Sequence, residues 1–192
     1  MKITGRNSAR IGVGVTASIA FAFCVQAPPA YAASDSVSFT RQAQSTNYNC
    51  GPAAVRAALS VTDSTPPSQA TLGGELGTRS DIGTSYAKIA GVLNNRQSRN
   101  DYLTSTVTSG DTVMANAKLS ITKHSSVAIL SVNNSGLPWG GSSIGHYIVI
   151  YGYNDSNGNL SVWDPTPGSG NHTLSASQAY KASKAQNSKM IW

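Results

Sequence analysis

The order of hydrophobic patterns along the chain predicts an α+β fold, with a helical half followed by an antiparallel β half. In the first half, apolar residues recur at spacings of three and four, which places them on one face of a helix. In the second half, short runs rich in Val, Ile and Tyr alternate with segments rich in Gly, Asn and Pro, which is typical of strands and turns. Because helices and strands are segregated along the chain, we expect an antiparallel sheet packed against helices.

Residues 1–32 are predicted to be a secretory signal peptide and not part of the folded domain. Residues 11–25 form an apolar run that is short for a membrane span, and Ala30-Tyr31-Ala32 has the small-x-small pattern of a cleavage site. We expect cleavage after Ala32, which leaves residues 33–192 as a single domain. The basic residues that precede the apolar run are Lys2, Arg6 and Arg10.

Removal of the signal peptide lowers the formal net charge from +6 to +3, because three of the 14 basic residues leave while all 8 acidic ones stay. The remaining Lys and Arg are scattered, which does not favour a nucleic-acid partner. We therefore expect a secreted, extracellular monomer with no membrane attachment after signal cleavage. The three His and the single Cys of residues 33–192 are widely separated, so no metal site and no cofactor are expected.

The helices are predicted from their apolar positions and their end signals. Asn49 is a suitable N-cap for the first, Gly77 ends the second, and Thr84 or Ser85 precedes the third. Asp111 is expected to cap the fourth. The expected helices are Cys50–Ser60, Ser68–Leu76, a helix from about residue 85 to Asn94-Asn95, one from Asp111 to Leu119, and Thr173–Ala182.

The strands are predicted from β-branched and aromatic residues between turn signals. The clearest is His146–Tyr153, which is followed by a turn containing Asn157-Gly158. Residues 133–145 form a glycine-rich loop that carries Trp139. The expected strands are Tyr102–Thr108, Ser126–Val132, His146–Tyr153, Leu160–Trp163 and Lys189–Trp192, and the polar segment before Thr46 is expected to be extended.

Cys50 is the only cysteine of residues 33–192, so it has no partner for a disulfide within the domain. One interpretation is an inert buried thiol. The other is a reactive thiol, and the position of Cys50 at the start of a helix favours it, because the positive end of the helix dipole stabilises a thiolate.

A reactive cysteine needs a base nearby, and His146 is the best candidate. His124 and His172 lie in polar segments and are expected at the surface. His146 opens the strongest apolar strand, and a strand end fixes a side chain while leaving it at the rim of a sheet. A histidine with a purely structural role is the alternative.

Asp164 ends the strand that returns from the strand of His146. An odd-length loop from Asn154 to Gly158 would place Asp164 opposite Ile148, on the same face as His146 and within hydrogen-bonding reach of it. A two-residue turn at Asn157-Gly158 would instead place it on the other face. An Asp-Pro turn start is the alternative interpretation of this residue.

Acyl transfer also needs donors for the oxyanion that develops on the substrate. The backbone N–H of Cys50 is one, and a side-chain amide is a suitable second. Gln44 lies six residues before Cys50, close enough for an extended segment to fold back beside the helix, and Gln42 is the alternative.

Three motifs in this order give the chain a recognisable pattern: Gln44-x5-Cys50-Gly51-Pro52-Ala53-Ala54, Gly145-His146-Tyr147-Ile148-Val149-Ile150-Tyr151-Gly152-Tyr153, and Asp164-Pro165. Over about residues 42–192 the chain resembles the papain-like peptidases of the bacteriocin-processing type, cysteine peptidase family 39 and its secreted relatives. The resemblance implies a papain-like fold with Cys50 as nucleophile, His146 as base, Asp164 as the residue that orients the base, and Gln44 in the oxyanion hole.

The expected function is hydrolysis of a peptide or protein substrate through an acyl-enzyme. Gly136–Gly145, with Trp139, is expected to form part of the wall of the substrate cleft. The chain departs from the transporter-linked members of the family, because it has no membrane domain and carries Asn49 where they usually have Asp. Two other functions stay open: a cell-wall amidase or acyl transferase on the same fold, and a binding or inhibitory module without turnover.

Overall fold

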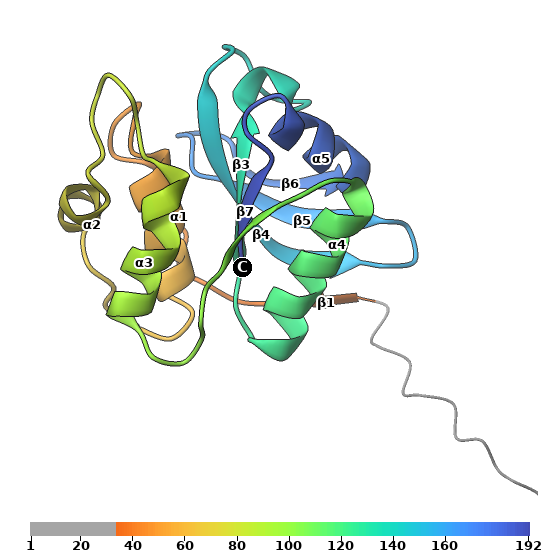
Figure 1. Ribbon diagram of the computed structural model, residues 1–192, viewed down its shortest axis with the longest axis horizontal. Coiled ribbons are helices and arrows are strands. Elements are labelled where there is room, and N and C mark those ends of the chain that lie inside the picture. Colours follow the sequence, from red (N-terminus) through yellow and green to blue (C-terminus); the bar gives the residue numbers. More distant parts are fainter. Residues whose placement is uncertain (1–33) are drawn as a thin grey trace, which may run out of the picture. The chain divides into compact units, whose positions relative to one another are not determined.

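The computed structural model describes residues 34–192 (Figure 1), and the predicted signal peptide lies outside the described residues. Within this part of the chain, no helix is both long and apolar enough to span a membrane. The helices are α1 Cys50–Leu59, α2 Gln69–Leu76, α3 Tyr86–Arg96, α4 Gly110–Lys118 and α5 Ala176–Lys184. The strands are β1 Ser34–Ser36, β2 Thr104–Thr106, β3 Ala128–Asn133, β4 Gly145–Asn154, β5 Asn159–Asp164, β6 Gly170–Ser175 and β7 Lys189–Ile191.

All strand pairs in the sheet are antiparallel, so the predicted α+β class is confirmed, and the arrangement is papain-like. The strand order is β2-β7-β3-β4-β5-β6, and β1 pairs with the second half of β4. The sequence-adjacent strands β4, β5 and β6 form a meander. By contrast, β7 returns from the C-terminus to pair between β2 and β3.

The sheet separates two hydrophobic cores, because successive side chains of a strand point to opposite faces. On one face, residues such as Ile129 and Val149 pack with α1, α2 and α3. On the other face, Leu130 and Ile148 pack with α4 and α5. Figure 1 shows α1–α3 as one group, with the strands between that group and α4 and α5.

The helix ends lie close to the predicted ones, but the predicted caps differ in their contacts. Ser85 occupies the N-cap position of α3 without a side-chain cap hydrogen bond. Ser68 caps α2 by accepting a hydrogen bond from the Thr71 N–H, and Gly77 ends this helix in the left-handed conformation. The predicted cap of α4 is wrong, because Ser109 accepts from the Thr112 N–H and Asp111 lies in the first turn. A serine hydroxyl one residue before the helix reaches that N–H, whereas a first-turn carboxylate acts only through its charge.

The helix predicted over Thr173–Ala182 begins later, because strand β6 occupies residues 170–175. This edge strand is largely polar, and of its residues only Leu174 is buried, so it carries no apolar alternation to reveal it. The helix starts where Ser175 and Gln178 form a reciprocal capping box, and it ends at Lys184.

The β4–β5 hairpin differs from the predicted one in its turn. Four residues, 155–158, connect the pair Asn154–Asn159, and an even loop of this length alone would place Asp164 on the face opposite to His146. A β-bulge between Ile150 and Gly152 then shifts the register by one residue. Beyond it Val149 pairs with Trp163, so Asp164 comes beside Ile148 and on the same face as His146. The predicted loop is wrong, and the bulge corrects its effect on the register.

Candidate active site

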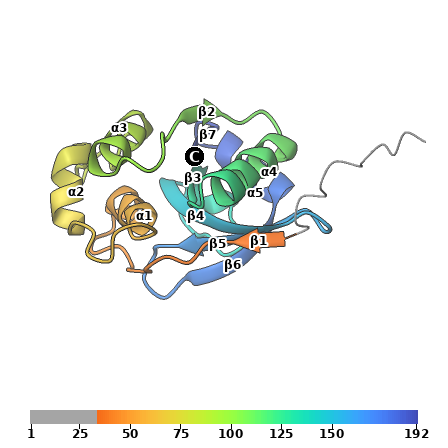
Figure 2. The ribbon, with the colours of Figure 1, turned by 90° about the horizontal axis from the view of Figure 1, so that it is seen from below.

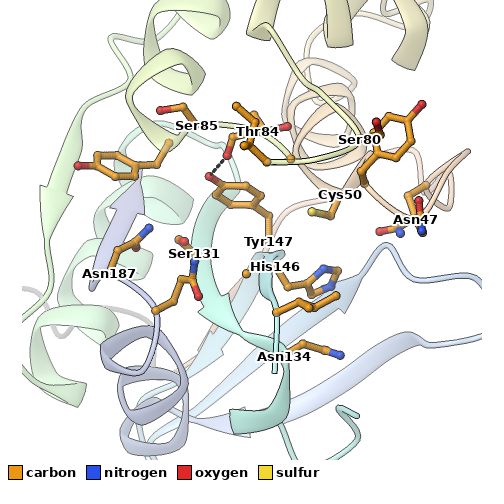
Figure 3. A pocket seen from close by; sticks show the side chains of 18 of the residues that line it. Asn47, Cys50, Ser80, Thr84, Ser85, Ser131, Asn134, His146, Tyr147 and Asn187 are labelled. Atoms are coloured by element: carbon orange, nitrogen blue, oxygen red, sulfur yellow. Dashed lines mark hydrogen bonds between the residues drawn. The ribbon is translucent and has the colours of Figure 1, made fainter. Parts of the chain in front are cut away.

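A cleft of about 640 Å³ opens at the end of the sheet, where the start of α1 meets the start of β4 (Figure 3). Gln44, Cys50 and His146 line it, whereas Asp164 lies behind His146 and is only 2% exposed. The other lining residues are mostly uncharged: Asn47, Tyr48, Ser80, Asp81, Ile82, Gly83, Thr84, Ser85, Tyr86, Ser131, Asn134, Ile144, Gly145, Tyr147, Thr166, Gln186 and Asn187.

Cys50 is the first residue of α1 and the one free cysteine of residues 34–192. It is 7% exposed, and Figure 3 shows its sulfur and the His146 ring facing the same hollow. Asn49 occupies the N-cap position, but its side chain does not cap the helix as predicted. Instead its amide Nδ2 donates to the hydroxyl of Ser45 at 2.9 Å, which ties the preceding segment to the helix start.

Gly51, the residue after Cys50, is required to be a glycine because the loop that carries Thr84 packs closely against it. A Cβ at Gly51 would lie 2.4 Å from the Thr84 hydroxyl oxygen, well inside contact distance. The loop before α3 therefore packs directly on the first turn of α1. The Tyr147 hydroxyl fixes the same loop by donating to the carbonyl of Thr84 at 2.8 Å (Figure 3).

His146 and Asp164 form a buried hydrogen-bonded pair, with 2.9 Å between His146 Nε2 and Asp164 Oδ1. The carboxylate only accepts, so Nε2 carries the proton. The Thr166 hydroxyl also lies 3.5 Å from this Nε2. Cys50 is a further hydrogen-bonding partner of the imidazole, which leaves Nδ1 as the ring nitrogen for the thiol. The backbone N–H of Thr166 also donates to Asp164 Oδ1, at 2.8 Å.

These contacts move the pKa values of both residues. Burial alone would lower the pKa of His146, but the hydrogen bonds and charges of Asp164 and Cys50 outweigh it and raise the pKa to about 9. Burial alone would raise the pKa of Asp164. The hydrogen bond and charge of His146, with the N–H groups of Thr166 and Trp139, instead hold that pKa well below its usual range. Both shifts favour a charged imidazolium–carboxylate pair.

Of the predicted wall Gly136–Gly145, Ile144 and Gly145 line the cleft, but Trp139 does not, so its predicted place there is wrong. Trp139 instead supports the carboxylate. Its indole Nε1 donates to Asp164 Oδ2 at 2.8 Å. The indole stacks on His172, with ring centroids 3.8 Å apart, and His172 Nε2 is 2.9 Å from the Ser169 hydroxyl. His172 is thus half-buried in this stack and not at the surface as expected, whereas His124 is exposed.

Gln44 lines the cleft together with Cys50, whereas Gln42 does not. The backbone N–H of Gln44 donates to the carbonyl of Pro165 at 2.8 Å, so the segment before α1 touches the end of β5. The side chain of Gln44 is half-buried.

The structure brings Gln44, Cys50, His146 and Asp164 to one site, with Thr166, Trp139 and Tyr147 as additional contacts. Sequence reasoning placed none of these three in their roles, because their contacts join loops whose paths are not encoded in hydrophobic periodicity. Tyr147 follows His146 in the sequence, and Thr166 follows Asp164-Pro165, but neither neighbour relation indicates a contact. A thiol beside an imidazole held by a carboxylate is the set of groups that cysteine nucleophiles use.

Within residues 34–192, no three His, Cys, Asp or Glu side chains gather closely enough to hold a metal ion.

The family model for peptidase C39-like proteins matches residues 35–189. The chain belongs to the peptidase C39-like family. Among curated proteins, none matches the sequence.

Solved structures of C39 peptidase domains share this fold. The peptidase domain of Streptococcus ComA, a transporter in a quorum-sensing pathway, has a TM-score of 0.56 at 20% identity, over 81% of this chain and 97% of that one. The double-glycine-motif protease of an AMS/PCAT transporter, solved with its leader peptide, has a TM-score of 0.57 at 13% identity, over 82% and 91%. A C39-like peptidase from Bacillus anthracis has a TM-score of 0.57 at 12% identity, over 82% and 96%.

Proposed function

We propose that this C39-like protein is a cysteine peptidase that hydrolyses peptide bonds through an acyl-enzyme. One observation carries the proposal: a helix-terminal cysteine in a cleft has as its partner an imidazole that a buried carboxylate holds at 2.9 Å. Membership of a peptidase-like family and the C39 fold support it.

In the acylation step, the thiolate of Cys50 attacks the carbonyl carbon of the substrate, and the carbonyl π electrons move to the oxygen. The tetrahedral intermediate collapses when the C–N bond breaks, and the imidazolium of His146 gives its Nδ1 proton to the departing amine. Asp164 keeps Nε2 protonated and the ring oriented throughout. The products are a thioester on Cys50, a free amine and a neutral imidazole.

The developing oxyanion is stabilised by two donors at the mouth of the cleft. One is the backbone N–H of Cys50 at the positive end of α1, and the other is the side-chain amide of Gln44. Deacylation then reverses the proton transfer. The neutral imidazole of His146 takes a proton from water, the hydroxide attacks the thioester, and the thiolate leaves to regenerate the ion pair.

The proposed substrate is a peptide. The C39 peptidase of the AMS/PCAT transporter is solved with a leader peptide, which supports a peptide as the ligand of this cleft. A cell-wall amidase or an acyl transferase would use the same groups, so these activities are outcomes of the experiment below.

The test combines alkylation of Cys50 by iodoacetamide with cleavage of a mixed-sequence peptide library read by mass spectrometry. We expect rapid alkylation near neutral pH that slows by about a hundredfold or more in His146→Ala, since loss of a base typically costs 10²–10⁴. Cys50→Ala and His146→Ala should leave the peptides uncut, and the wild type should release new amino termini.

His124→Ala is the matched control, because His124 is an exposed histidine outside the cleft. Equal, slow alkylation of the wild type and His146→Ala would contradict the proposal. Alkylation that depends on His146 without peptide cleavage, but with release of peptidoglycan amides or transfer to an added amine, would replace the peptidase by the amidase or the transferase.

Secretion as a monomer belongs to the same proposal. The predicted signal peptide supports export, with a mature chain that begins at Ala33. Amino-terminal sequencing of the protein from culture medium should give this residue, and light scattering should give the monomer mass. Retention in the cell with an intact Met1 would contradict export.

A further inference from the structure

The buried amide of Gln69 lies where the segment before Cys50 passes the start of α2. Gln69 is the first residue of α2 and is 5% exposed. Its Oε1 accepts from the N–H of Ser45 at 2.9 Å, and its Nε2 donates to the carbonyl of Ala43 at 2.8 Å. Nε2 also donates to the Oε1 and the carbonyl of Gln42, at 3.2 and 3.4 Å. The hydrogen bonds to Ala43 and Ser45 therefore bracket Gln44, the residue between them.

The bracketed segment has no helix or strand of its own. After β1 the chain runs along the sheet to α1 (Figure 2), and between residues 37 and 49 its backbone follows an irregular path. Its polar backbone groups need partners from other elements. Gln69 supplies them for Ala43 and Ser45, and the carbonyl of Pro165, next to Asp164, accepts from the N–H of Gln44 itself at 2.8 Å.

The tip of the Gln44 side chain has no such support. Its Oε1 is buried and has no hydrogen-bond partner among the described residues. Because no contact at Oε1 fixes this amide, its position depends on the backbone from which it extends. A shift of that backbone by about 1 Å would move the amide out of reach of a substrate oxyanion, and misplacements of this size cost about a hundredfold in rate.

We propose that Gln69 is the positioning residue for Gln44, and that it keeps the Gln44 amide at the oxyanion position of the cleft. This inference rests on the proposed function. A glutamine suits the task because one side chain offers a donor and an acceptor at once, as the carbonyl of Ala43 and the N–H of Ser45 require. Glutamate would satisfy only Ser45, and methionine, which has the same length, would satisfy neither.

The experiment compares two reactions of Cys50 in Gln69→Met. Iodoacetamide alkylates the thiolate by displacement at a saturated carbon, with no oxyanion, so its rate should stay within about twofold of the wild type. Hydrolysis of the peptide best cleaved in the library passes through an oxyanion, so its kcat should fall by about 10- to 100-fold with little change in KM. Gln69→Glu keeps the acceptor for Ser45, so its kcat should lie between those of the wild type and Gln69→Met.

Two further variants separate positioning from general destabilisation. In Gln97→Met an amide that ties a loop elsewhere is lost, since Gln97 binds the N–H groups of Arg99 and Asn100 and the carbonyl of Asn100. We expect a lower melting temperature there and an unchanged kcat. In Gln44→Ala, adding Gln69→Met should cause no further loss of kcat, because the amide to be positioned is already gone.

Each alternative outcome is distinct. An unchanged kcat in Gln69→Met, an equal fall in alkylation and hydrolysis, or independent losses in the double variant would overturn the positioning role and leave the peptidase proposal standing. A wild type that cleaves no peptide would overturn the peptidase proposal and this inference with it.

Discussion

Asp164 accepts hydrogen bonds from three donors on three segments: the imidazole of His146, the N–H of Thr166 and the indole of Trp139. A carboxylate with this many donors stays ionised and cannot rotate freely. The imidazole therefore has one orientation, with its other nitrogen toward Cys50. The raised pKa of His146 is a direct consequence of this arrangement.

The first prediction concerns the pH dependence of peptide hydrolysis. Acylation needs the imidazolium of His146, whose pKa is about 9, so kcat/KM should fall as the pH rises through about 9. Asp164→Asn weakens the hydrogen bond and removes the charge by which Asp164 raises this pKa. The alkaline midpoint should then move down by about one unit or more, and kcat should also fall. Rates of hydrolysis of the library-derived peptide, measured from pH 5 to 10, give the alkaline midpoint of the wild type and that of Asp164→Asn.

Asp155→Asn is the control for this prediction. Asp155 is an exposed carboxylate paired with Lys118, so its removal changes the net charge equally without touching the cleft. Its pH profile should match that of the wild type. An alkaline midpoint that is the same in Asp164→Asn and in the wild type would show that Asp164 does not set the pKa of His146.

The second prediction concerns Trp139. Trp139→Phe removes the hydrogen bond to Asp164 and keeps an aromatic ring over His172. We expect kcat to fall by about three- to tenfold, because one of several donors to the carboxylate is lost. Trp192→Phe is the matched control, since its indole donates at the same 2.8 Å to Ser105, outside the cleft. Equal kcat values in the two variants would show that the hydrogen bond from Trp139 to Asp164 does not contribute to catalysis.

At this scale, residue chemistry and chain position predicted Cys50, His146 and Asp164 as neighbours, whereas Gln44 was chosen over Gln42 only through the resemblance to the C39 peptidases. Each has a reactive or hydrogen-bonding group next to a predictable element end. The hydrogen bonds that hold these residues in place were not predictable from the sequence. Trp139 reaches Asp164 across 25 positions, and Gln69 reaches Ala43 across 26, and in each pair one residue lies in an irregular segment. Amides and indoles are common in polar segments, so nothing in the sequence distinguishes these two.

At the scale of elements, the start of α1 is shaped by the loop that packs on it. The third prediction is that Gly51→Ala lowers the free energy of unfolding by about 1–2 kcal/mol, because the new methyl group overlaps Thr84 and overpacking typically costs about 1–3 kcal/mol. The displaced loop lines the cleft, so activity should fall as well. Urea denaturation and peptide hydrolysis measure the two effects.

Gly91→Ala is its control. Gly91 is an exposed residue of α3 with no atom within 4 Å of the added methyl group, so the substitution should raise stability by about 0.5–1 kcal/mol through helix propensity alone. Equal effects of the two substitutions would mean that Thr84 moves away without cost.

The elements that the sequence predicted well are those with a strong period or a clear end signal, such as α2 between Ser68 and Gly77. The differences have physical causes. Strand β6 is a polar edge strand that takes its partners from β5, so its own residues carry no pattern. The bulge at the middle of β4 is set by pairing across the hairpin. Because it changes the face of Asp164, a local feature of the sheet decides whether the site can form.

At the scale of the molecule, the first core forms between the helices α1–α3 and one face of the sheet, and the cleft lies at the end of that contact. The division into a helical half and a β half followed from the order of patterns. The strand order did not, since β7, at the C-terminus, pairs with β2 and β3 from the middle of the chain.

The fourth prediction concerns stability against pH. His146 has a folded pKa of about 9 against about 6.5 when unfolded, so its contribution is complete below pH 6.5 and is lost as the pH rises through 9. Its full size is on the order of 3 kcal/mol. Asp164 has a lowered folded pKa, so its contribution is present above about pH 4 and is lost as the pH falls further. Stability should therefore be highest between about pH 4 and 6.5 and decline toward 9.

Asp164→Asn tests this prediction, because without the carboxylate both contributions shrink. Urea denaturation at intervals from pH 4 to 9 should give a smaller decline in that variant than in the wild type and in Asp155→Asn. Tyr102 and Tyr147 also have raised pKa values, from burial first, but their neutral phenols lose protons only above about pH 10 and so leave this window unaffected. A wild-type stability that stays constant between pH 6.5 and 9 would mean that the imidazole of His146 is neutral in the folded protein, and the thiolate–imidazolium pair on which acylation depends would not exist there.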